Sequence, residues 1–254
     1  HFLEWLKQQI KQHEIDVLLI AGDVFDSPNP SAESQRVYYR FLREVTSENP
    51  SLQIVIIAGN HDSAARLEAP NPLLEDMNII VRGTVRRNAE GDIDLQHFIV
   101  PLYTEGKVTA YCLAVPYLRQ GDYPSAENYS KGVQQLYEQL FNKVKEKGIP
   151  VVAMGHLQAT GSEISEDDRS ERTVIGGLEC VSPDAFNEAI TYTALGHLHR
   201  SQRVSHRENV RYSGTPMPMS FAEKNNASGV VMITIDTELS LIHISEPTRL
   251  LSIS

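Results

Sequence analysis

The sequence predicts a layered α/β fold with central parallel strands, and three observations support this. Four short apolar runs have the β-branched character of strands buried on both faces. Helical patterns lie between them, and strands that alternate with helices favour parallel pairing. Each run also leads into a Gly followed by a side chain that can bind a metal. The runs are IDVLLIAGD (15–23), QIVIIAGNHD (53–62), PVVAMGH (150–156) and TYTALGHLH (191–199).

The helical patterns are apolar stripes with spacings of three or four residues. The stripes contain Phe2, Leu6 and Ile10; Val37, Phe41, Leu42 and Val45; and Val133, Leu136, Leu140 and Val144. Residues 79–118 and 201–236 differ, because Gly and charged turns separate their apolar runs, and we expect antiparallel strands there. The polar stretch 158–172 predicts a loop, either near the site or simply on the surface.

Composition limits the class of protein without selecting a substrate. The chain has 254 residues, 41% of them hydrophobic, which suffices for one large α/β domain. No apolar run is long enough to span a membrane. The two cysteines, Cys112 and Cys180, form no C-x-x-C pair, so we expect buried thiols and a cytoplasmic location. The net charge of −10 offers no basic footprint for nucleic acid, although bound divalent cations would reverse the local sign of a carboxylate-rich site.

The four Gly-containing turns together predict a metal site. In parallel sheets, groups beyond the carboxyl ends of the strands meet in one crevice. Oxygen and imidazole ligands without thiolate suit Mn, Fe or Zn, and a carboxylate can bridge two ions. Each motif alone is commonly a turn or a hydrogen-bonded histidine, but the four in this order argue against that interpretation. The candidate ligands are Asp23 as the bridge, Asn60, His156, His197 and His199.

The last two candidates, His197 and His199, would face the same way if the extended strand continued through them. Two arginine clusters could track phosphate groups, with a solvated surface as the alternative for each. They are Arg82, Arg86 and Arg87, and Arg200, Arg203, Arg207 and Arg211.

The ordered motifs GDVFD, GNHD, MGH and GHLH resemble those of the calcineurin-like metallophosphoesterase superfamily. The resemblance implies a four-layer α/β/β/α sandwich and a centre of two divalent metal ions, with Mn as the best match. It implies that His61 stands over the scissile phosphate and that Asp26 orients it, both as catalytic residues. In the same scheme Asp23 bridges the ions and His199 serves the first. Asn60, His156 and His197 complete the second ion's site.

Longer stretches resemble one subgroup, the SbcD-type DNA nucleases, more than protein phosphatases. These stretches are GDVFDSPNPS, AGNHDS, LAVPYLR (113–119), YTALGHLHR and VRYSGTPMPMSF (210–221). The resemblance implies a DNA exo- and endonuclease in end processing, recombination and replication. It implies an SbcC-like SMC-type ATPase as partner and leaves a homodimer open. The alternatives are a phosphodiesterase acting on small nucleotides and a non-catalytic metallophosphoesterase-like binding module.

The chain departs from the family pattern at both ends. The family begins with a strand ending in D-x-H, and this sequence starts in the helix after it. The first ion would then keep only Asp23 and His199, so we expect impaired activity. We expect a nuclease domain over 1–237 that lacks its first strand. The tail, 238–254, is atypical, and we interpret it either as a non-native ending or as a terminal strand.

Overall fold

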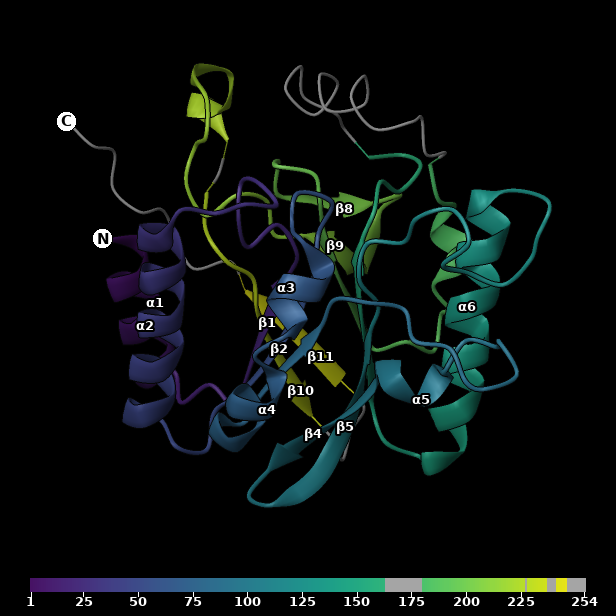
Figure 1. The fold of residues 1–254 in the computed structure, drawn as a ribbon, viewed down its shortest axis with the longest axis horizontal. Helices are drawn as coiled ribbons and strands as arrows, with labels where there is room; N and C mark the ends of the chain where they lie inside the picture. Colours follow the sequence, from purple (N-terminus) through teal and green to yellow (C-terminus); the bar gives the residue numbers. More distant parts are fainter. Residues whose placement is uncertain (163–179, 227, 237–240, 246–254) are drawn as a thin grey trace.

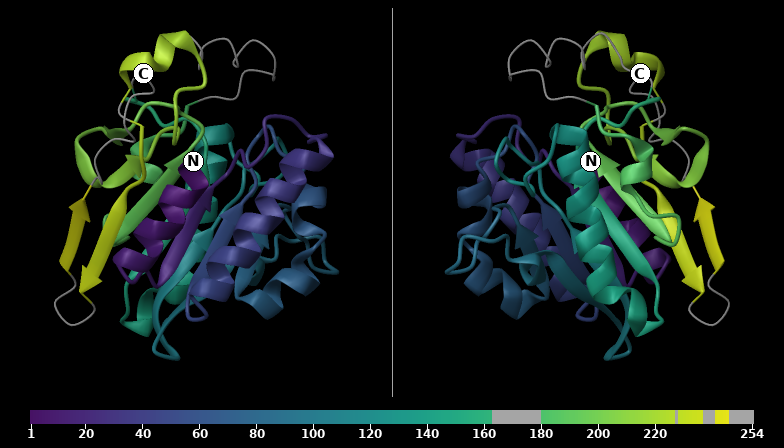
Figure 2. Two further views of the ribbon diagram at one scale, coloured as in Figure 1. Left: turned by 90° about the vertical axis from the view of Figure 1, so that its left-hand side faces the viewer. Right: turned by 90° about the vertical axis from the view of Figure 1, so that its right-hand side faces the viewer.

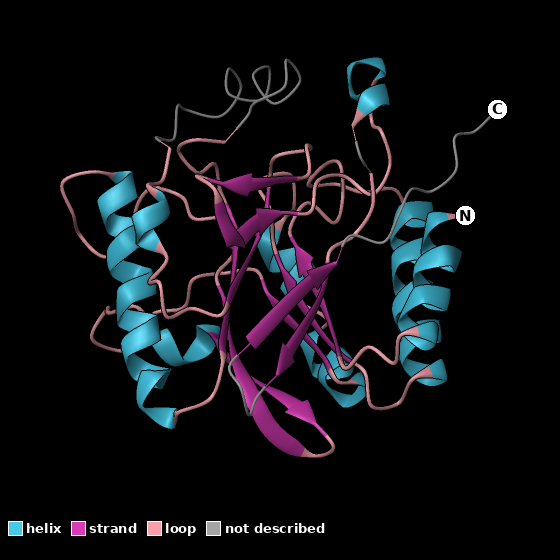
Figure 3. Ribbon diagram, turned by 180° about the vertical axis from the view of Figure 1, so that it is seen from behind, coloured by secondary structure: helices cyan, strands magenta, loops and turns pink. Residues whose placement is uncertain are grey.

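Two β-sheets lie face to face between layers of helices, so the molecule has the four-layer α/β/β/α architecture that the sequence indicated (Figures 1 and 3). The computed structural model describes residues 1–162, 180–226, 228–236 and 241–245. Helices α1 and α2 lie on one side of the paired sheets and α6 on the other (Figure 1). In Figure 2, α1 and α2 lie nearest the viewer in the left view and α6 lies nearest in the right view.

The first sheet has three parallel strands in the order β1-β2-β3. Its outer face packs against the first two helices, with Ile10, Leu42 and Val45 in the shared core. Val37 was expected in this core but is 40% exposed, and Tyr38 is buried instead, because the helix presents positions 38, 41, 42 and 45 to the sheet. The elements are α1 (Phe2–Gln12), β1 (Val17–Ala21), α2 (Ala32–Glu48), β2 (Gln53–Ile57), α3 (Ala64–Glu68), α4 (Asn71–Leu74) and β3 (Ile79–Arg82).

The second sheet has six strands in the order β4-β5-β6-β7-β9-β8. Its central pairs are parallel and its two edge pairs, β4–β5 and β8–β9, are antiparallel. Leu136, Leu140 and Val144 of α6 are buried against its outer face, as predicted. The elements are α5 (Leu95–Phe98), β4 (Ile99–Thr104), β5 (Lys107–Ala114), α6 (Tyr129–Val144), β6 (Val151–His156), β7 (Tyr192–Gly196), β8 (Gln202–Val204) and β9 (Arg207–Tyr212).

The antiparallel expectation for residues 79–118 is correct only in part. β4 and β5 form the expected hairpin, but β3 pairs parallel with β2, and Leu95–Phe98 is helical. The connection through α3 and α4 explains the difference, because a helical crossover returns the chain parallel to its previous strand. Asn71 fixes this connection, since its side chain donates to the carbonyl of Val81 and accepts from the Val81 amide. The second expected segment contains the antiparallel pair β8–β9, but β9 also pairs parallel with β7.

Mostly small and β-branched side chains fill the space between the two sheets. Val55, Ile57, Ala114 and Met154 belong to this core. Cys112 is also buried there, and burial raises the pKa of its thiol to about 12. Cys180, expected to be buried as well, is only partly buried.

The C-terminal part of the described chain is a hairpin of β10 (Met232–Asp236) and β11 (Leu241–Ser245). Residues 241–245 form a strand, and whether 238–254 is a native or a non-native ending stays a prediction. Most of the polar stretch 158–172 falls in 163–179, outside the described residues. Within the described ranges, no helix has the length and apolar character needed to cross a membrane. Short 3-10 turns complete the fold: η1 (Glu75–Met77), η2 (Lys145–Lys147), η3 (Pro183–Ala185) and η4 (Phe221–Asn225).

Candidate metal centre

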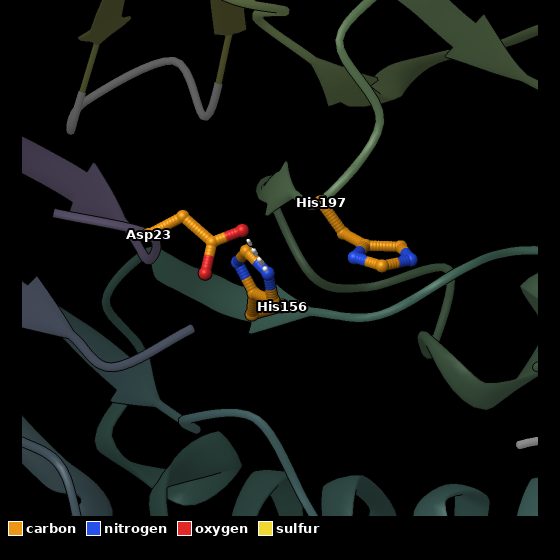
Figure 4. A group of neighbouring side chains, drawn as sticks. All are labelled: Asp23, His156 and His197. Carbon is orange, nitrogen blue, oxygen red and sulfur yellow. Dashed lines mark ion pairs between the residues drawn. The ribbon is translucent and has the colours of Figure 1, made fainter. Parts of the chain in front are cut away.

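Four of the predicted ligands meet where β1 and β2 of one sheet and β6 and β7 of the other end. The side-chain oxygen of Asn60 lies 2.9 Å from Nε2 of His156 and 3.1 Å from Nδ1 of His197. Nε2 of His156 is also 3.0 Å from Oδ2 of Asp23. One ligand atom from each of Asp23, His156 and His197 lies within 4.8 Å of the others (Figure 4). The predicted convergence of strand ends is thus present in the fold.

The donor atoms of this cluster fit a divalent cation. His156 Nδ1 donates to the carbonyl of Ala21 at 2.8 Å, so in the neutral ring the Nε2 lone pair faces the oxygens of Asn60 and Asp23. Lone pairs that converge in this way repel one another unless a proton or a cation lies among them. Ligands bound at about 2.0–2.2 Å and at right angles are about 3 Å apart. The separations of 2.9, 3.0 and 3.1 Å match that spacing.

Two glycines make the close approach of the loops possible. A Cβ on Gly22, whose φ is +90°, would lie 2.3 Å from Nδ1 of His156. A Cβ on Gly59 would lie 2.0 Å from Oδ1 of Asp23. Both separations are shorter than any van der Waals contact, so a side chain at either position would displace a ligand. The Gly in these two motifs therefore supports the geometry of the site as well as the turn of the chain.

Asp23 and His156 stabilise each other's charged forms in the absence of a metal. Burial alone would raise the pKa of Asp23, but the charge and hydrogen bond of His156 outweigh burial and lower it to about 2. Burial would likewise lower the pKa of His156, but the charge of Asp23 outweighs it and the pKa is raised. Each group therefore favours the charged form of the other, and a cation bound by both would compete with the proton on His156.

Asp62 links the loops of the candidate site, a role that the sequence pattern did not indicate. Its carboxylate is 1% exposed and accepts the main-chain N–H groups of Gly59, Val24 and Phe25 at 2.8, 3.1 and 3.0 Å. In the opposite direction, Oδ1 of Asp23 accepts the N–H of His61 at 2.9 Å. Carboxylates from both loops, Asp62 and Asp23, thus hydrogen-bond the loops after β1 and β2 to each other. Burial raises the pKa of Asp62 despite these three hydrogen bonds. The only sequence signal was its place at the end of GNHD.

The predicted catalytic residues, His61 and Asp26, are neighbours in the structure. Nδ1 of His61 donates to the main-chain carbonyl of Asp26 at 2.9 Å, so the contact that orients the ring comes from the main chain of Asp26. The Asp26 side chain is exposed. The carbonyl holds the proton on Nδ1, which leaves Nε2 as the nitrogen for proton exchange.

His199 lies outside the group formed by Asp23, His156 and His197. β7 ends at Gly196, and His197 has φ of +98°, so the extended conformation that would align the two histidines does not persist. Nδ1 of His199 lies 2.5 Å from Oε1 of Glu223, whose other oxygen accepts the N–H of Met219 at 2.7 Å. Glu223 is buried, and no motif in the sequence predicted its role. Glu223 lies just after the stretch VRYSGTPMPMSF, and this position was the only feature of the sequence that could have drawn attention to it.

Most of the arginines proposed to contact phosphate bind protein groups. In the first cluster, Arg86 pairs with Glu68, while the other two donate to main-chain carbonyls. In the second cluster, Arg203 pairs with Glu208, and Arg207 donates to the carbonyls of Pro183 and Phe186. Arg211 is largely buried, and Arg200 is exposed. A DNA-binding role for the second cluster stays a prediction.

The fold and the candidate site are consistent with a phosphoesterase, the class that comparison with known proteins gives. The family model for calcineurin-like phosphoesterases matches residues 1–201, and the chain belongs to this family. The chain is 38% identical over 258 residues to the SbcD subunit of the SbcCD nuclease of Rhodobacter capsulatus, a match that covers 97% of the chain and 63% of that protein. It is 30% identical over 247 residues to the SbcD subunit from Escherichia coli K12, with 92% and 58% covered.

A third relative, the SbcD subunit from Bacillus subtilis, is 28% identical over 249 residues, covering 91% of the chain and 59% of that protein. The chain therefore spans about three fifths of the length of the curated relatives it matches. Within its family it is similar to the SbcD subunits of SbcCD nucleases.

Proposed function

We propose that the chain is a metal-dependent DNA nuclease, the counterpart of SbcD in a complex with an SMC-type ATPase resembling SbcC. The observation that carries the phosphodiesterase part is the convergence of Asn60, His156 and His197 on Asp23 with spacings that fit a divalent cation. The choice of DNA as substrate, and of the ATPase as partner, is supported by the similarity to an SbcD nuclease subunit across 97% of the chain.

In this proposal the metal site is built by Asp23, Asn60, His156 and His197, with Mn²⁺ as the expected ion. A bound divalent ion would neutralise phosphate oxygens and make water a better nucleophile near neutral pH. The chain itself positions the ligands through the Asp62 hydrogen bonds and excludes water from His156, which is 1% exposed. It also holds the His61 ring with Nδ1 against the Asp26 carbonyl, so that Nε2 delivers a proton to the leaving oxygen.

Asp23 and His199 are the residues of this chain that would hold a second ion. The contact between His199 and Glu223 supports a role for His199 as an oriented imidazole, because a carboxylate fixes the tautomer of a ligating histidine. Because His199 lies apart from the group formed by Asp23, His156 and His197, we propose one strong ion site, a weaker second site and, from that weaker site, impaired hydrolysis. The domain bounds 1–237, the cytoplasmic location, exo- and endonuclease action and a homodimer stay predictions.

Calorimetric titration with Mn²⁺ tests the site, and hydrolysis assays on the same samples test the activity. We expect about one strong ion per chain and Mn²⁺-dependent cleavage of blunt-ended duplex DNA. Asn60→Ala should lose the strong site, whereas His13→Ala, a change of an exposed histidine in the C-cap of α1, should keep it. Equal Mn²⁺ binding by Asn60→Ala would overturn the proposed site.

The substrates in the assay separate the alternative functions. Bis-p-nitrophenyl phosphate reports any phosphodiesterase, and a 3′,5′-cyclic nucleotide reports one that acts on small nucleotides. Cleavage of both without cleavage of duplex ends would favour the small-nucleotide phosphodiesterase. Strong Mn²⁺ binding without turnover of any of the three substrates would favour the binding module.

A further inference from the structure

The segment after β5 passes beside the metal site without a role in the function proposed so far. It belongs to the stretch LAVPYLR, residues 113–119. The main-chain N–H of Tyr117 donates to the carbonyl of Ala58 at 2.9 Å, and Ala58 lies two positions before the ligand Asn60. The segment is therefore hydrogen-bonded directly to the loop that contains the proposed ligand Asn60.

Burial alternates along this segment, so that two polar side chains point away from the core on either side of a buried one. Leu118 is 2% exposed and anchors the segment in the core under α6. Its neighbours behave differently: Tyr117 is half-buried and Arg119 is exposed. A turn fixes the position of Arg119, because its N–H donates to Oδ2 of Asp122 and the Asp122 N–H donates to its carbonyl. The guanidinium of Arg119 forms no ion pair or hydrogen bond with the residues that the structure describes.

The ring of Tyr117 stands against the buried ligand His156. The two ring centroids are 6.2 Å apart and the planes meet at 80°, an edge-to-face arrangement. The half-buried phenol presents one hydrogen-bond donor beside His156, and the exposed guanidinium of Arg119 follows two positions further along the segment.

We propose that Tyr117 and Arg119 form a phosphate-binding subsite at the edge of the metal site, which holds the non-bridging oxygens of a bound phosphodiester. This inference rests on the proposed phosphodiesterase function and adds a substrate-binding element to it. A guanidinium presents a planar set of N–H donors that matches two phosphate oxygens, and a phenol presents one donor. A cation at this place also offsets the acidity of a chain with net charge −10 when an anionic substrate approaches.

The test uses inorganic phosphate as a probe of the subsite, measured by calorimetry on the Mn²⁺-loaded chain. Arg119→Gln should weaken phosphate binding about tenfold or more, because a charge-assisted hydrogen bond is lost. Tyr117→Phe keeps the ring against His156 but removes the hydroxyl, so it should weaken phosphate binding a few-fold. Arg119→Lys retains the charge but not the planar fork, so its affinity should lie between those of the parent and Arg119→Gln. Mn²⁺ affinity should stay unchanged in all three variants.

Two matched control variants remove a guanidinium and a phenol hydroxyl at positions outside the proposed subsite. Arg43→Gln changes an arginine on α2 whose side chain is 69% exposed, and Tyr103→Phe changes an exposed tyrosine on β4. Neither should alter phosphate binding. With bis-p-nitrophenyl phosphate, Arg119→Gln should raise KM more than it lowers kcat, as expected for a group that binds the substrate before the chemical step.

The outcomes separate the inference from the proposed function. Unchanged phosphate affinity and KM in both Arg119→Gln and Tyr117→Phe would overturn the subsite, even in an active phosphodiesterase. A fall in Mn²⁺ affinity would also overturn it, since the two residues would then act by supporting the ligands. Phosphate binding that depends on Arg119, in a chain that hydrolyses none of the phosphodiesters, would support the subsite and refute the proposed function instead.

Discussion

Asn60 and His156 are 96 positions apart in the sequence, yet the amide oxygen of one lies 2.9 Å from Nε2 of the other. Asn60 follows β2 in the first sheet, and His156 ends β6 in the second. A cation held by both residues would therefore link the two sheets of the sandwich. Metal binding and the stability of the fold should be coupled for this reason.

The first prediction is that Mn²⁺ raises the melting temperature of the chain and that EDTA reverses the increase. A ligand present at 100 times its Kd stabilises a protein by about 2.7 kcal/mol, because it binds only the folded state. Asn60→Ala should abolish this increase, while His13→Ala should retain it. Thermal melts followed by circular dichroism provide the measurement. An equal response of Asn60→Ala to Mn²⁺ would show that the ion binds elsewhere.

The second prediction concerns Asp62, which fastens the loops after β1 and β2. Asp62→Ala should destabilise the metal-free chain by at least about 2 kcal/mol, because three main-chain N–H groups lose their acceptor in a buried place. Mn²⁺ affinity should fall as well, since Asp23 and Asn60 lose their support. Urea denaturation and calorimetry measure the two effects. The control is Asp76→Ala, an exposed carboxylate in η1, for which we expect neither effect.

The third prediction assigns proton transfer to His61. His61→Ala should leave Mn²⁺ affinity nearly unchanged and lower kcat by roughly 10²–10⁴-fold, the range for loss of a general acid. The Asp26 contact comes from a main-chain carbonyl, so Asp26→Ala should reduce kcat less than His61→Ala does. Steady-state kinetics on bis-p-nitrophenyl phosphate compares the variants. A large loss of Mn²⁺ affinity in His61→Ala would instead make this residue a metal ligand.

The fourth prediction is that the stability of the chain depends on pH and that Mn²⁺ shifts this dependence. The raised pKa of His156 gives stabilisation that is complete below its ordinary value of 6.5 and is lost as pH rises through the raised value. The pKa of Asp23, lowered from 3.8 to about 2, gives stabilisation that is present above 3.8 and is lost as pH falls towards 2. In EDTA, this pair should therefore contribute most to stability between pH 3.8 and 6.5.

With Mn²⁺ present, the optimum should move to higher pH, because the ion competes with the His156 proton. Melting temperatures measured from about pH 4 to 9, with and without Mn²⁺, test both statements. His156→Phe removes the pair and should flatten the difference between the two curves. Identical pH profiles with and without Mn²⁺ would contradict the assignment of His156 as a ligand.

The fifth prediction tests the second arginine cluster as a DNA contact. Arg203 is about half exposed and pairs with Glu208, so Arg203→Glu reverses a surface charge without opening the core. If the cluster contacts phosphates, the variant should bind duplex DNA more weakly, and the slope of log affinity against log salt should decrease in magnitude by about 1. Arg43→Glu on α2 is the control for charge alone. An unaltered slope would show that the cluster is a solvated surface.

Local rules were enough to predict the four strand–Gly–ligand segments. β-branched runs specify strands, Gly permits the sharp turn after them, and parallel strands bring their carboxyl ends to one edge. Asp23, Asn60, His156 and His197 were identified as neighbours in this way, and the structure brings them together. The resemblance of the ordered motifs to a known family added the second sheet and the order of the layers.

Tertiary structure alone decided which groups support these ligands. Asp62 accepts from Val24 and Phe25 across 38 and 37 positions, and Glu223 reaches back 24 positions to His199. Local sequence preferences do not predict such hydrogen bonds, because these bonds depend on where distant segments pack. The same reason explains β3: its apolar run allows either direction of pairing, and only the packing of α3 and α4 against the first sheet makes it parallel.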